Sequence, residues 1–396
     1  MTLEMVIVLA VMAAGGILLW PRLARARLWR ATITPLASII GSGFLVLGPI
    51  LNDSFGYLAP LVMGLLCAGG YAFGAAIRAN IVTLEHGAPD RARQRLEVLS
   101  GWALAGAYVV SVCYYLNLFG AFAVSLTPFD SGLAARIVTT AMLALILAVG
   151  WTRGFDALER MEQVSVGIKL AIIAGLIAGM VGYFVTQARA DALVINTPVT
   201  TGWPAVTLLF GLIVTVQGFE TSRYLGDEYD PATRVRSMRL AQAISIVIYM
   251  VYVGLLSYLF AEGSVTLTET AIIDMTGIIT PLLPVLLVAA ALSAQFSAAV
   301  ADTSGSGGLV AEQSNGRLSA RRTYALLALI GIALTWAANV FEIISYASRA
   351  FALYYALQAA IAARTARQNG QPLQALLYAA LTLLGALIIV FGTPVE

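Results

Sequence analysis

The chain has 396 residues, of which 60% are hydrophobic and only 11% are charged, and its mean hydropathy is +0.86. A soluble domain carries about 25% charged residues, so the composition predicts a polytopic membrane protein and argues against a nucleic-acid-binding protein. Cys67 and Cys113 both fall in apolar stretches and the chain has one histidine, so no disulfide, metal site or cofactor is expected.

Apolar stretches of about twenty residues, the length that spans a bilayer as a helix, recur along the whole chain. In chain order they lie at 2–20, 31–51, 55–77, 99–127, 133–150, 163–185, 204–222, 239–261, 283–312, 323–338, 340–363 and 373–391. The longest polar connection is 78–98, and its second half is expected to form an amphipathic helix on the membrane surface. The sequence therefore predicts an all-α polytopic membrane protein with about 12 transmembrane helices.

The basic residues lie almost entirely in alternate connections. Nineteen of the 23 Lys and Arg residues follow odd-numbered spans, whereas only Arg136 and Arg189 lie in the opposite connections. Loops rich in arginine remain in the cytoplasm. We therefore expect a multi-pass protein of the plasma (inner) membrane with both termini external and the first span retained as an anchor.

The second span is interrupted at its centre by Gly41-Ser42-Gly43, three weak helix formers. A helix that only crosses lipid gains nothing from them, because unpaired backbone groups are costly in hydrocarbon. Unwinding here frees N–H groups at one helix end, which suit a carboxylate, and carbonyls at the other, which suit an ammonium or a metal ion. A small-residue surface for helix packing is the alternative interpretation.

A second interruption falls near Gln217-Gly218-Phe219-Glu220, in the span 204–222. When the first and last spans are set aside, ten core helices remain, and the two interrupted ones begin the two halves. Five is an odd number, so the halves run with opposite topology, as in inverted-repeat secondary transporters. We expect an N-terminal anchor and linker at 1–30, five-helix repeats at 31–185 and 204–365, and a C-terminal transmembrane helix at 366–396, with one site at the bilayer midplane.

Residues around both interruptions resemble the amino acid–polyamine–organocation (APC) superfamily of permeases. The stretch IIGSGFLVLGP is similar to the helix 1 signature of that family, and VQGFETSRYLGDEYDPATRVRSMR is similar to the end of its helix 6. The stretch GGLVAEQSNGRLSARR resembles the loop after its helix 8, although Gly307 replaces an arginine that is usual there. The resemblance covers about residues 31–365 and implies the five-plus-five inverted-repeat (LeuT-type) fold.

The resemblance also implies which residues contact the substrate. In the family the two broken segments bind the carboxylate and the amine, and these segments correspond here to Ile40, Gly41, Ser42, Gly43, Gln217, Gly218 and Phe219. The glutamate of the G-F-E sequence, Glu220, usually supports the unwound segment. Val214 and Val216 stand where the family often has aromatic residues that close over the substrate, a departure that puts a standard amino-acid pocket in doubt.

Three further polar residues within spans are candidates. Tyr114 and Asn117 lie in core helix 3, which faces the broken pair in this family, so they are expected in the substrate site; tyrosine packed in a core is the alternative. Arg349 lies about nine residues from the outer end of core helix 10. It is expected either to recognise an anion or to close an outer gate, unless it extends towards the outer surface.

Energy coupling is expected to involve Lys169, the only lysine of the chain, about two turns inside core helix 5. A desolvated lysine can lose its proton, whereas arginine effectively cannot. The resemblance implies that a lysine at this position couples transport to protons. Core helix 8 supplies the neighbouring polar residues Ser297, Asp302 and Thr303. Sodium bound by these hydroxyls and Asp302 is the alternative, as is a lysine that extends to the cytoplasmic face.

The motifs of metalloproteases, serine hydrolases and phosphate-binding loops do not occur in the sequence, so no catalytic residue is predicted. The favoured function is a secondary active transporter, proton-coupled, for a small amine-bearing or carboxylate-bearing solute such as an amino acid. The partners expected are this solute, a coupling ion and the lipid bilayer. A sodium-coupled symporter, an inorganic-cation transporter on the same fold and a transport-inactive sensor remain alternatives.

Overall fold

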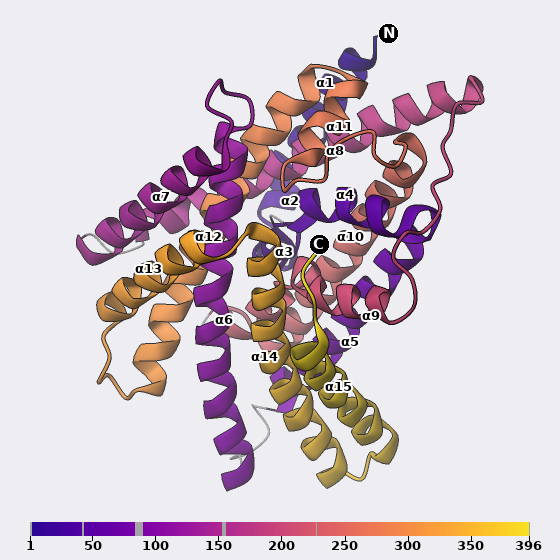
Figure 1. Cartoon of the computed structure of the whole chain (residues 1–396). Coiled ribbons are helices and arrows are strands. Elements are labelled where there is room, and N and C mark those ends of the chain that lie inside the picture. The colour runs from indigo at the N-terminus through magenta and orange to yellow at the C-terminus, as the bar shows by residue number, and fades with distance from the viewer. Residues whose placement is uncertain (1, 42, 84–89, 153–155, 227, 396) are drawn as a thin grey trace.

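The computed structural model describes residues 2–41, 43–83, 90–152, 156–226 and 228–395, with the backbone alone described for 156–165. All regular structure in these residues is helical, with fifteen α-helices and three short 3₁₀ segments (Figure 1). The prediction of an all-α polytopic membrane protein is confirmed. Ser42, one of the predicted substrate-binding residues, lies outside the described residues.

The helices follow the predicted spans closely. In chain order they are α1 (Leu3–Leu19), α2 (Pro21–Ala24), α3 (Arg27–Ile39), α4 (Gly43–Phe55), η1 (Gly56–Leu58), α5 (Ala59–Thr83), α6 (Arg91–Val124), α7 (Gly132–Thr152), α8 (Asp156–Arg189), α9 (Gly202–Gly211), η2 (Ile213–Val216), η3 (Phe219–Tyr224), α10 (Pro231–Leu259), α11 (Ala271–Ile279), α12 (Leu282–Gln313), α13 (Ala320–Ala337), α14 (Val340–Gln368) and α15 (Pro372–Phe391).

Residues 91–98 do not form the separate surface helix that we expected. They are the first turns of α6, which runs unbroken for 34 residues. Asp90 caps this helix by accepting a 2.7 Å hydrogen bond from the Arg93 N–H, and neither Gly nor Pro occurs between Arg91 and Ser100 to end it. Another addition is α11, a short helix within the connection 262–282.

Seven helical stretches of the described chain are long and apolar enough to cross a membrane. The number is smaller than twelve partly because the interrupted spans are divided: α3 and α4 have 13 residues each, and α9 has 10. Each half is too short to cross a bilayer alone. The division of the two spans is therefore a property of the backbone as well as of the sequence.

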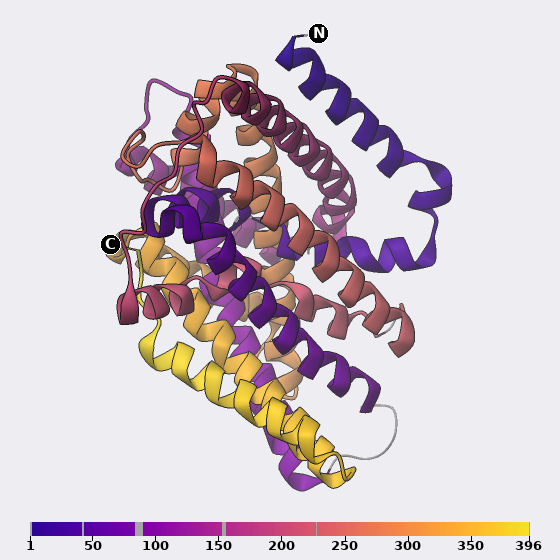
Figure 2. The same cartoon turned by 90° about the vertical axis from the view of Figure 1, so that its right-hand side faces the viewer.

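The divided helices lie inside the bundle and the extra helices lie at its edge. α3 packs against α10 and η3, and α4 packs against α10, α5 and η2. α1 packs along α8, and α15 packs along α14, on opposite sides of the molecule (Figures 1 and 2). α6 packs extensively against both α12 and α14, and the divided pair lies mainly against α10, α5 and α14.

Candidate functional site

The first interruption separates α3 from α4. α3 ends at Ile39, and Ile40 leaves the helical conformation with φ −82° and ψ 50°. α4 starts at Gly43, so the first-turn N–H groups of α4 and the last-turn carbonyls of α3 have no partners within their own helices. These ends are buried, because Ile40, Phe44 and Val46 are each 1% exposed.

The second interruption is longer than the sequence indicated. α9 ends at Gly211, η2 covers only four residues, and Gln217 is fully extended with φ −79° and ψ 175°. Gly218 follows with φ +113°, a conformation that residues with a side chain rarely adopt. Because η2 is a 3₁₀ segment, the backbone leaves the α-helical form after Gly211, well before Gln217, and η3 beyond Gly218 is also a 3₁₀ segment.

The two interruptions meet. A Cβ atom on Gly43 would lie 2.8 Å from the Thr215 Cα, and a Cβ atom on Gly218 would lie 2.5 Å from the Ser38 carbonyl carbon. The Tyr249 hydroxyl, on α10, lies 3.0 Å from the Ile39 carbonyl oxygen and 2.6 Å from the Thr215 carbonyl oxygen. The Tyr249 hydroxyl therefore lies between one carbonyl of each broken segment.

Side chains from α14 hold the second interruption in place. Ser348 donates a 2.6 Å hydrogen bond to the Gly211 carbonyl and accepts one of 3.1 Å from the Val214 N–H, so it replaces bonds that the broken helix lacks. Glu220 accepts hydrogen bonds of 2.9 Å from the Gly218 N–H and from the Tyr355 hydroxyl. The Tyr355 ring stacks on Phe219 with centroids 5.2 Å apart. The hydrogen bonds of Glu220 thus support the unwound backbone.

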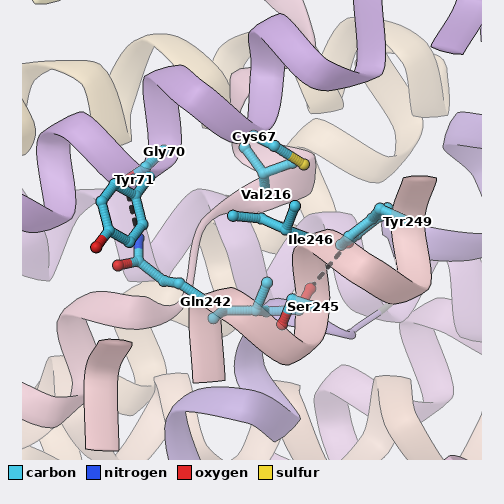
Figure 3. Close-up of a pocket in the computed structure, with 9 residues that line it drawn as sticks. Cys67, Gly70, Tyr71, Val216, Gln242, Ser245, Ile246 and Tyr249 are labelled. Atoms are coloured by element: carbon cyan, nitrogen blue, oxygen red, sulfur yellow. Dashed lines mark hydrogen bonds between the residues drawn. The ribbon is translucent and has the colours of Figure 1, made fainter. Parts of the chain in front are cut away.

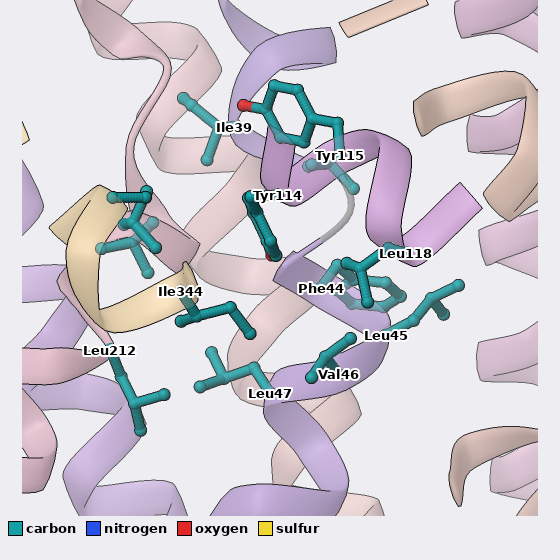
Figure 4. Packing of buried hydrophobic residues seen from close by; sticks show 14 of the residues in the cluster. Ile39, Phe44, Leu45, Val46, Leu47, Tyr114, Tyr115, Leu118, Leu212 and Ile344 are labelled. Carbon is teal, nitrogen blue, oxygen red and sulfur yellow. The ribbon is translucent and has the colours of Figure 1, made fainter. Parts of the chain in front are cut away.

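The predicted substrate-binding residues are brought together only in part. Ile40, Gly41, Gly43, Gly218 and Phe219 lie at the meeting of the two interruptions. Figure 4 shows Tyr114 among Ile39, Ile344 and the start of α4. Asn117 instead donates hydrogen bonds to the Thr335 hydroxyl on α13, at 2.9 Å, and to the Cys113 carbonyl of its own helix.

Two buried amides, one at the second interruption and one on α12, have unused hydrogen-bonding capacity. The Gln217 Nε2 donates to the Tyr115 hydroxyl at 2.8 Å, but its Oε1 has no partner among the described residues. Gln295 on α12 is fully buried, and neither amide atom has a partner in the described part of the chain. Gln295 lies seven residues, or about two turns, before Asp302 on α12, so the two side chains lie on the same face of this helix. Asp302 accepts a hydrogen bond from Ser111, so this face lies against α6. Unsatisfied buried polar groups are rare and favour a polar ligand.

A cavity of about 20 Å³, room for about one water molecule, lies beside the interruptions (Figure 3). Its lining includes Ile39 from α3, Val216 from η2, Cys67 from α5, and Gln242 and Tyr249 from α10. Val214 and Val216, which replace aromatic residues of the family pattern, are 3% and 5% exposed. The centre of the molecule is therefore tightly packed here.

Lys169 is 4% exposed, and its Nζ donates a 2.6 Å hydrogen bond to the Ala37 carbonyl in the last turn of α3. A cation at this helix end is stabilised by the helix dipole. Of the expected neighbours on α12, Asp302 accepts a hydrogen bond from Ser111, Thr303 donates to the Ala299 carbonyl at 2.6 Å, and Ser297 is half-buried. This hydrogen bond joins Lys169 to the broken helix α3.

Arg349 binds the backbone at the end of α15. Its Nε donates a 3.1 Å hydrogen bond to the Gly392 carbonyl, and a second guanidinium nitrogen binds the same oxygen. The next residue, Thr393, donates its N–H to the Thr207 carbonyl of α9 at 3.0 Å. The hydrogen bonds of Arg349 to Gly392 thus tie α14 to the segment after α15, and they favour a structural role over an anion site.

Arg349→Gln is therefore expected to lower stability without changing solute affinity. Hydrogen bonds to charged groups contribute about 1.5–3 kcal/mol, so the purified variant should unfold several degrees below the wild type. Arg189→Gln, which removes an exposed arginine at the end of α8, serves as the control and should unfold like the wild type. A variant with unchanged thermal unfolding but weakened solute binding would instead place Arg349 in the transport site.

A polar network on the arginine-rich side joins η3 to three long helices. Arg223 forms a 2.6 Å salt bridge with Glu97 of α6, and the two side chains are 8% and 20% exposed. Arg223 also donates to Gln358 of α14 at 2.6 Å, and Gln358 accepts a hydrogen bond from Asn80 of α5 at 2.9 Å. These contacts join η3, α5, α6 and α14 on the arginine-rich side of the molecule.

A more exposed ion pair lies below this network. Arg364 of α14 bonds Asp90 through its Nε at 3.1 Å. The Arg364 guanidinium, together with the Arg93 N–H, holds the pKa of the Asp90 carboxyl well below its usual range. Asp90 therefore stays ionised at neutral pH, and the pair adds a second link between α6 and α14 on this side.

Sequence reasoning missed the residues that connect the interruptions to the rest of the molecule, namely Tyr249, Ser348, Tyr355, Arg223 and Glu97, and it also missed the buried amide of Gln295. Some signals were present. Tyr249 and Tyr252 are three residues apart and therefore share a face of α10. Arg223 follows the G-F-E sequence by three residues. Its partner Glu97 lies 126 positions away, and nothing in the local pattern links the two.

Comparison with known proteins gives two matches. A family model described as "APC superfamily transporter" matches residues 21–392. A protein of Aquifex aeolicus (strain VF5), described as an "Uncharacterized protein", is 40% identical over 390 residues. That alignment covers 95% of this chain and 93% of the Aquifex protein.

Proposed function

The chain belongs to the APC superfamily of transporters, and from this we propose that it moves a small amine-bearing or carboxylate-bearing solute across the membrane by alternating access, coupled to protons. The resemblance found in the sequence is confirmed at the level of the family, and with it the assignment as a multi-pass membrane transporter. The proposal also includes the location in the plasma membrane, the external position of both termini, the solute class and the identity of the coupling ion.

One observation carries the solute class: the two interruptions lie against each other. The start of α4 offers backbone N–H groups and a positive dipole end, which favour a carboxylate. The carbonyls of Ile39 and Thr215 lie beside the Tyr249 hydroxyl and would favour an ammonium group. Gln217 Oε1 and the Gln295 amide, without partners among the described residues, add hydrogen-bonding capacity for a polar solute.

The position of Lys169 supports proton coupling. Its Nζ binds the Ala37 carbonyl at the end of α3, so the ammonium form depends on where α3 lies. When α3 moves, the lysine loses this acceptor, and a desolvated ammonium group can then release its proton, which arginine effectively cannot. We propose that proton release accompanies this movement. Ser297, Asp302 and Thr303 would line the path of the released proton. In a sodium-coupled symporter the hydroxyls of α12 and the Asp302 carboxylate would bind the ion instead, and Lys169 would have no part in coupling.

Two other functions receive less support. An inorganic-cation transporter needs oxygen ligands with free lone pairs, but the Glu220 Oε2 already accepts two hydrogen bonds, from Gly218 and Tyr355. A cation at this oxygen would compete with both hydrogen bonds, which hold the unwound backbone. A transport-inactive sensor would not need the capacity for polar contacts that remains at Gln217 and Gln295.

Alternating access also requires an inner gate that opens, and the Arg223–Glu97 network is the proposed gate. Several buried polar atoms around it have no partner in the described part of the chain: Asn80 Oδ1, Arg93 Nε, Glu97 Oε1 and Ser222 Oγ. Water entering from the arginine-rich side would satisfy them. Opening this gate therefore costs less than opening a fully bonded network would.

In the Glu97→Gln variant, the inner gate is expected to be open for a larger fraction of the time. The native Cys67 lines the cavity beside the interruptions and is 6% exposed, so it reports access once Cys113 is replaced by Ala. Hydrogen bonds to charged groups contribute about 1.5–3 kcal/mol, which corresponds to a roughly tenfold or greater rise in the labelling rate of Cys67 by a thiol reagent. Arg321→Gln, at the exposed start of α13, is the control.

An unchanged labelling rate in Glu97→Gln, with Cys67 labelled normally after unfolding, would remove the Arg223–Glu97 pair from the gate.

The proposed function is tested by a thermal-unfolding screen of the purified protein against amino acids, polyamines and nucleobase-like compounds. A solute that binds the folded state raises the unfolding temperature by mass action. We expect stabilisation by an amino acid or a related amine or carboxylate. Stabilisation by nucleobase-like compounds alone would contradict the proposed solute class.

A further inference from the structure

The first turns of α6 form an open groove away from the transport site. The groove has a volume of about 590 Å³ and is lined by Arg91, Gln94, Arg95, Val98, Leu99 and Trp102. These residues recur every three or four positions, so they lie on one face of the helix. Val98, Leu99 and Trp102 are 44%, 52% and 39% exposed, which is a large apolar surface next to two arginines.

This face is opposite to the one that α6 uses for the inner gate. Arg93, Glu97 and Ser100 point towards the gate network, where they bind Thr83, Arg223 and Gln358. Stepping 100° per residue places Arg91, Arg95 and Trp102 about half a turn away from them. The groove is therefore separate from the gate and from the substrate site.

α12, which packs along α6, ends near the top of the groove. The Gln313 side chain at the end of α12 would lie 2.7 Å from a Cβ on Gly101. Figures 1 and 2 show the first turns of α6 extending past this point to the edge of the molecule. Within the part of the chain that the structure describes, neither Arg91 nor Arg95 has an ion-pair or side-chain hydrogen-bond partner.

The order of chemistry along the groove matches that of a lipid at the membrane surface. The two arginines lie at the end of α6, Val98 and Leu99 follow one turn further in, and Trp102 comes next. Tryptophan concentrates at the membrane–water interface, and clustered arginines next to a spanning helix bind anionic headgroups. The acids of this end, Asp90 and Glu97, are bound by Arg364 and Arg223, so they do not neutralise the groove.

We propose that this groove binds one anionic phospholipid of the leaflet on the arginine-rich side. Arg91 and Arg95 hold the phosphate of the headgroup, Gln94 donates to its oxygens, and Val98, Leu99 and Trp102 cover the first part of an acyl chain. Arginine suits the phosphate because its planar donors can bind two oxygens together. The bound lipid would fix the end of α6 from the side opposite to the inner gate.

The test is native mass spectrometry of the full chain in detergent, titrated with phosphatidylglycerol or with phosphatidylcholine of the same acyl chains. The wild type should retain one phosphatidylglycerol in preference to phosphatidylcholine. Each arginine near an anionic lipid contributes about fivefold in affinity, so the double variant Arg91→Gln/Arg95→Gln should bind phosphatidylglycerol roughly 25-fold more weakly.

The control is Arg25→Gln/Arg30→Gln, which removes two exposed arginines from the same side of the protein and should retain the lipid. Equal retention by the Arg91/Arg95 variant and the wild type would overturn the proposal. Displacement of the lipid by inorganic phosphate at equal concentration would show a free-anion site instead, and a dimer lost in the Arg91/Arg95 variant would show that a second copy covers the groove. Either result would also overturn it. If the double variant does not fold, the two single variants carry the same comparison.

Discussion

Gly43→Val is expected to abolish solute uptake while leaving the protein inserted in the membrane. A Cβ atom at this position would lie 2.8 Å from the Thr215 Cα and 3.2 Å from the Thr215 carbonyl oxygen, so the two interruptions would have to move apart. Such overpacking costs about 1–3 kcal/mol, and it falls where the backbone must approach a solute. We expect uptake into proteoliposomes to fall by roughly a hundredfold or more.

Gly218→Ala should have a similar effect for two reasons. Its Cβ would lie 2.5 Å from the Ser38 carbonyl carbon, and its φ of +113° is strained for any residue with a side chain. Gly370→Ala separates the two causes, because Gly370 also has a positive φ of +70° but has no atom within 4 Å of its Cβ position. Gly370→Ala should transport nearly as well as the wild type.

Gly254→Val is the matched control for Gly43→Val, because a Cβ atom on Gly254 meets nothing within 4 Å. Membrane insertion and monodispersity of every variant are checked by size-exclusion chromatography. Normal uptake by both Gly43→Val and Gly218→Ala would contradict a transport site between the two interruptions. Gly41→Ala should be milder, since its Cβ contact, with the Ser38 carbonyl oxygen, is 3.0 Å.

Lys169→Arg is expected to abolish accumulation driven by a pH gradient although the charge is retained. Arginine can bind the Ala37 carbonyl as a cation, but it effectively cannot release a proton. Uptake is measured in proteoliposomes without sodium, with an imposed pH gradient. We expect the wild type to accumulate the solute and Lys169→Arg and Lys169→Ala to reach only the level seen without a gradient.

Exchange of labelled for unlabelled solute provides the control for this prediction. Exchange needs the binding site and the gates but no net proton movement, so folded Lys169 variants that can still change conformation should retain part of it. Accumulation that requires sodium, or a Lys169→Ala variant that still follows the pH gradient, would remove Lys169 from the coupling mechanism.

The spans could be predicted because each leaves a local signal of about twenty apolar residues. The positions of both interruptions could also be predicted, since Gly41 and Gly43 and then Gly218 are weak helix formers within apolar runs. The length of the second interruption could not be predicted from the sequence. Residues 213–216 read Ile-Val-Thr-Val, an apolar run like its surroundings, and they leave the α-helix where Ser348 from α14 takes over the bonds of Gly211 and Val214.

The candidate site was less predictable, because a polar residue in a span does not reveal its partner. Asn117 shares its helix with Tyr114, but it lies three residues on and binds Thr335 of α13. Arg349 was expected as an anion site or gate, yet its hydrogen bonds reach a backbone carbonyl at Gly392. Such contacts depend on how helices distant in sequence pack together, and one sequence carries no record of that.

The central claim, that a small amine or carboxylate binds between the two interruptions, is tested most directly by calorimetric titration. The solute is the compound that most raises the unfolding temperature of the wild type, and it is titrated into purified wild type, Gly43→Val and Gly254→Val. We predict binding to the wild type and to Gly254→Val, and no detectable binding to folded Gly43→Val. Equal affinity of Gly43→Val and the wild type for the solute would contradict the claim.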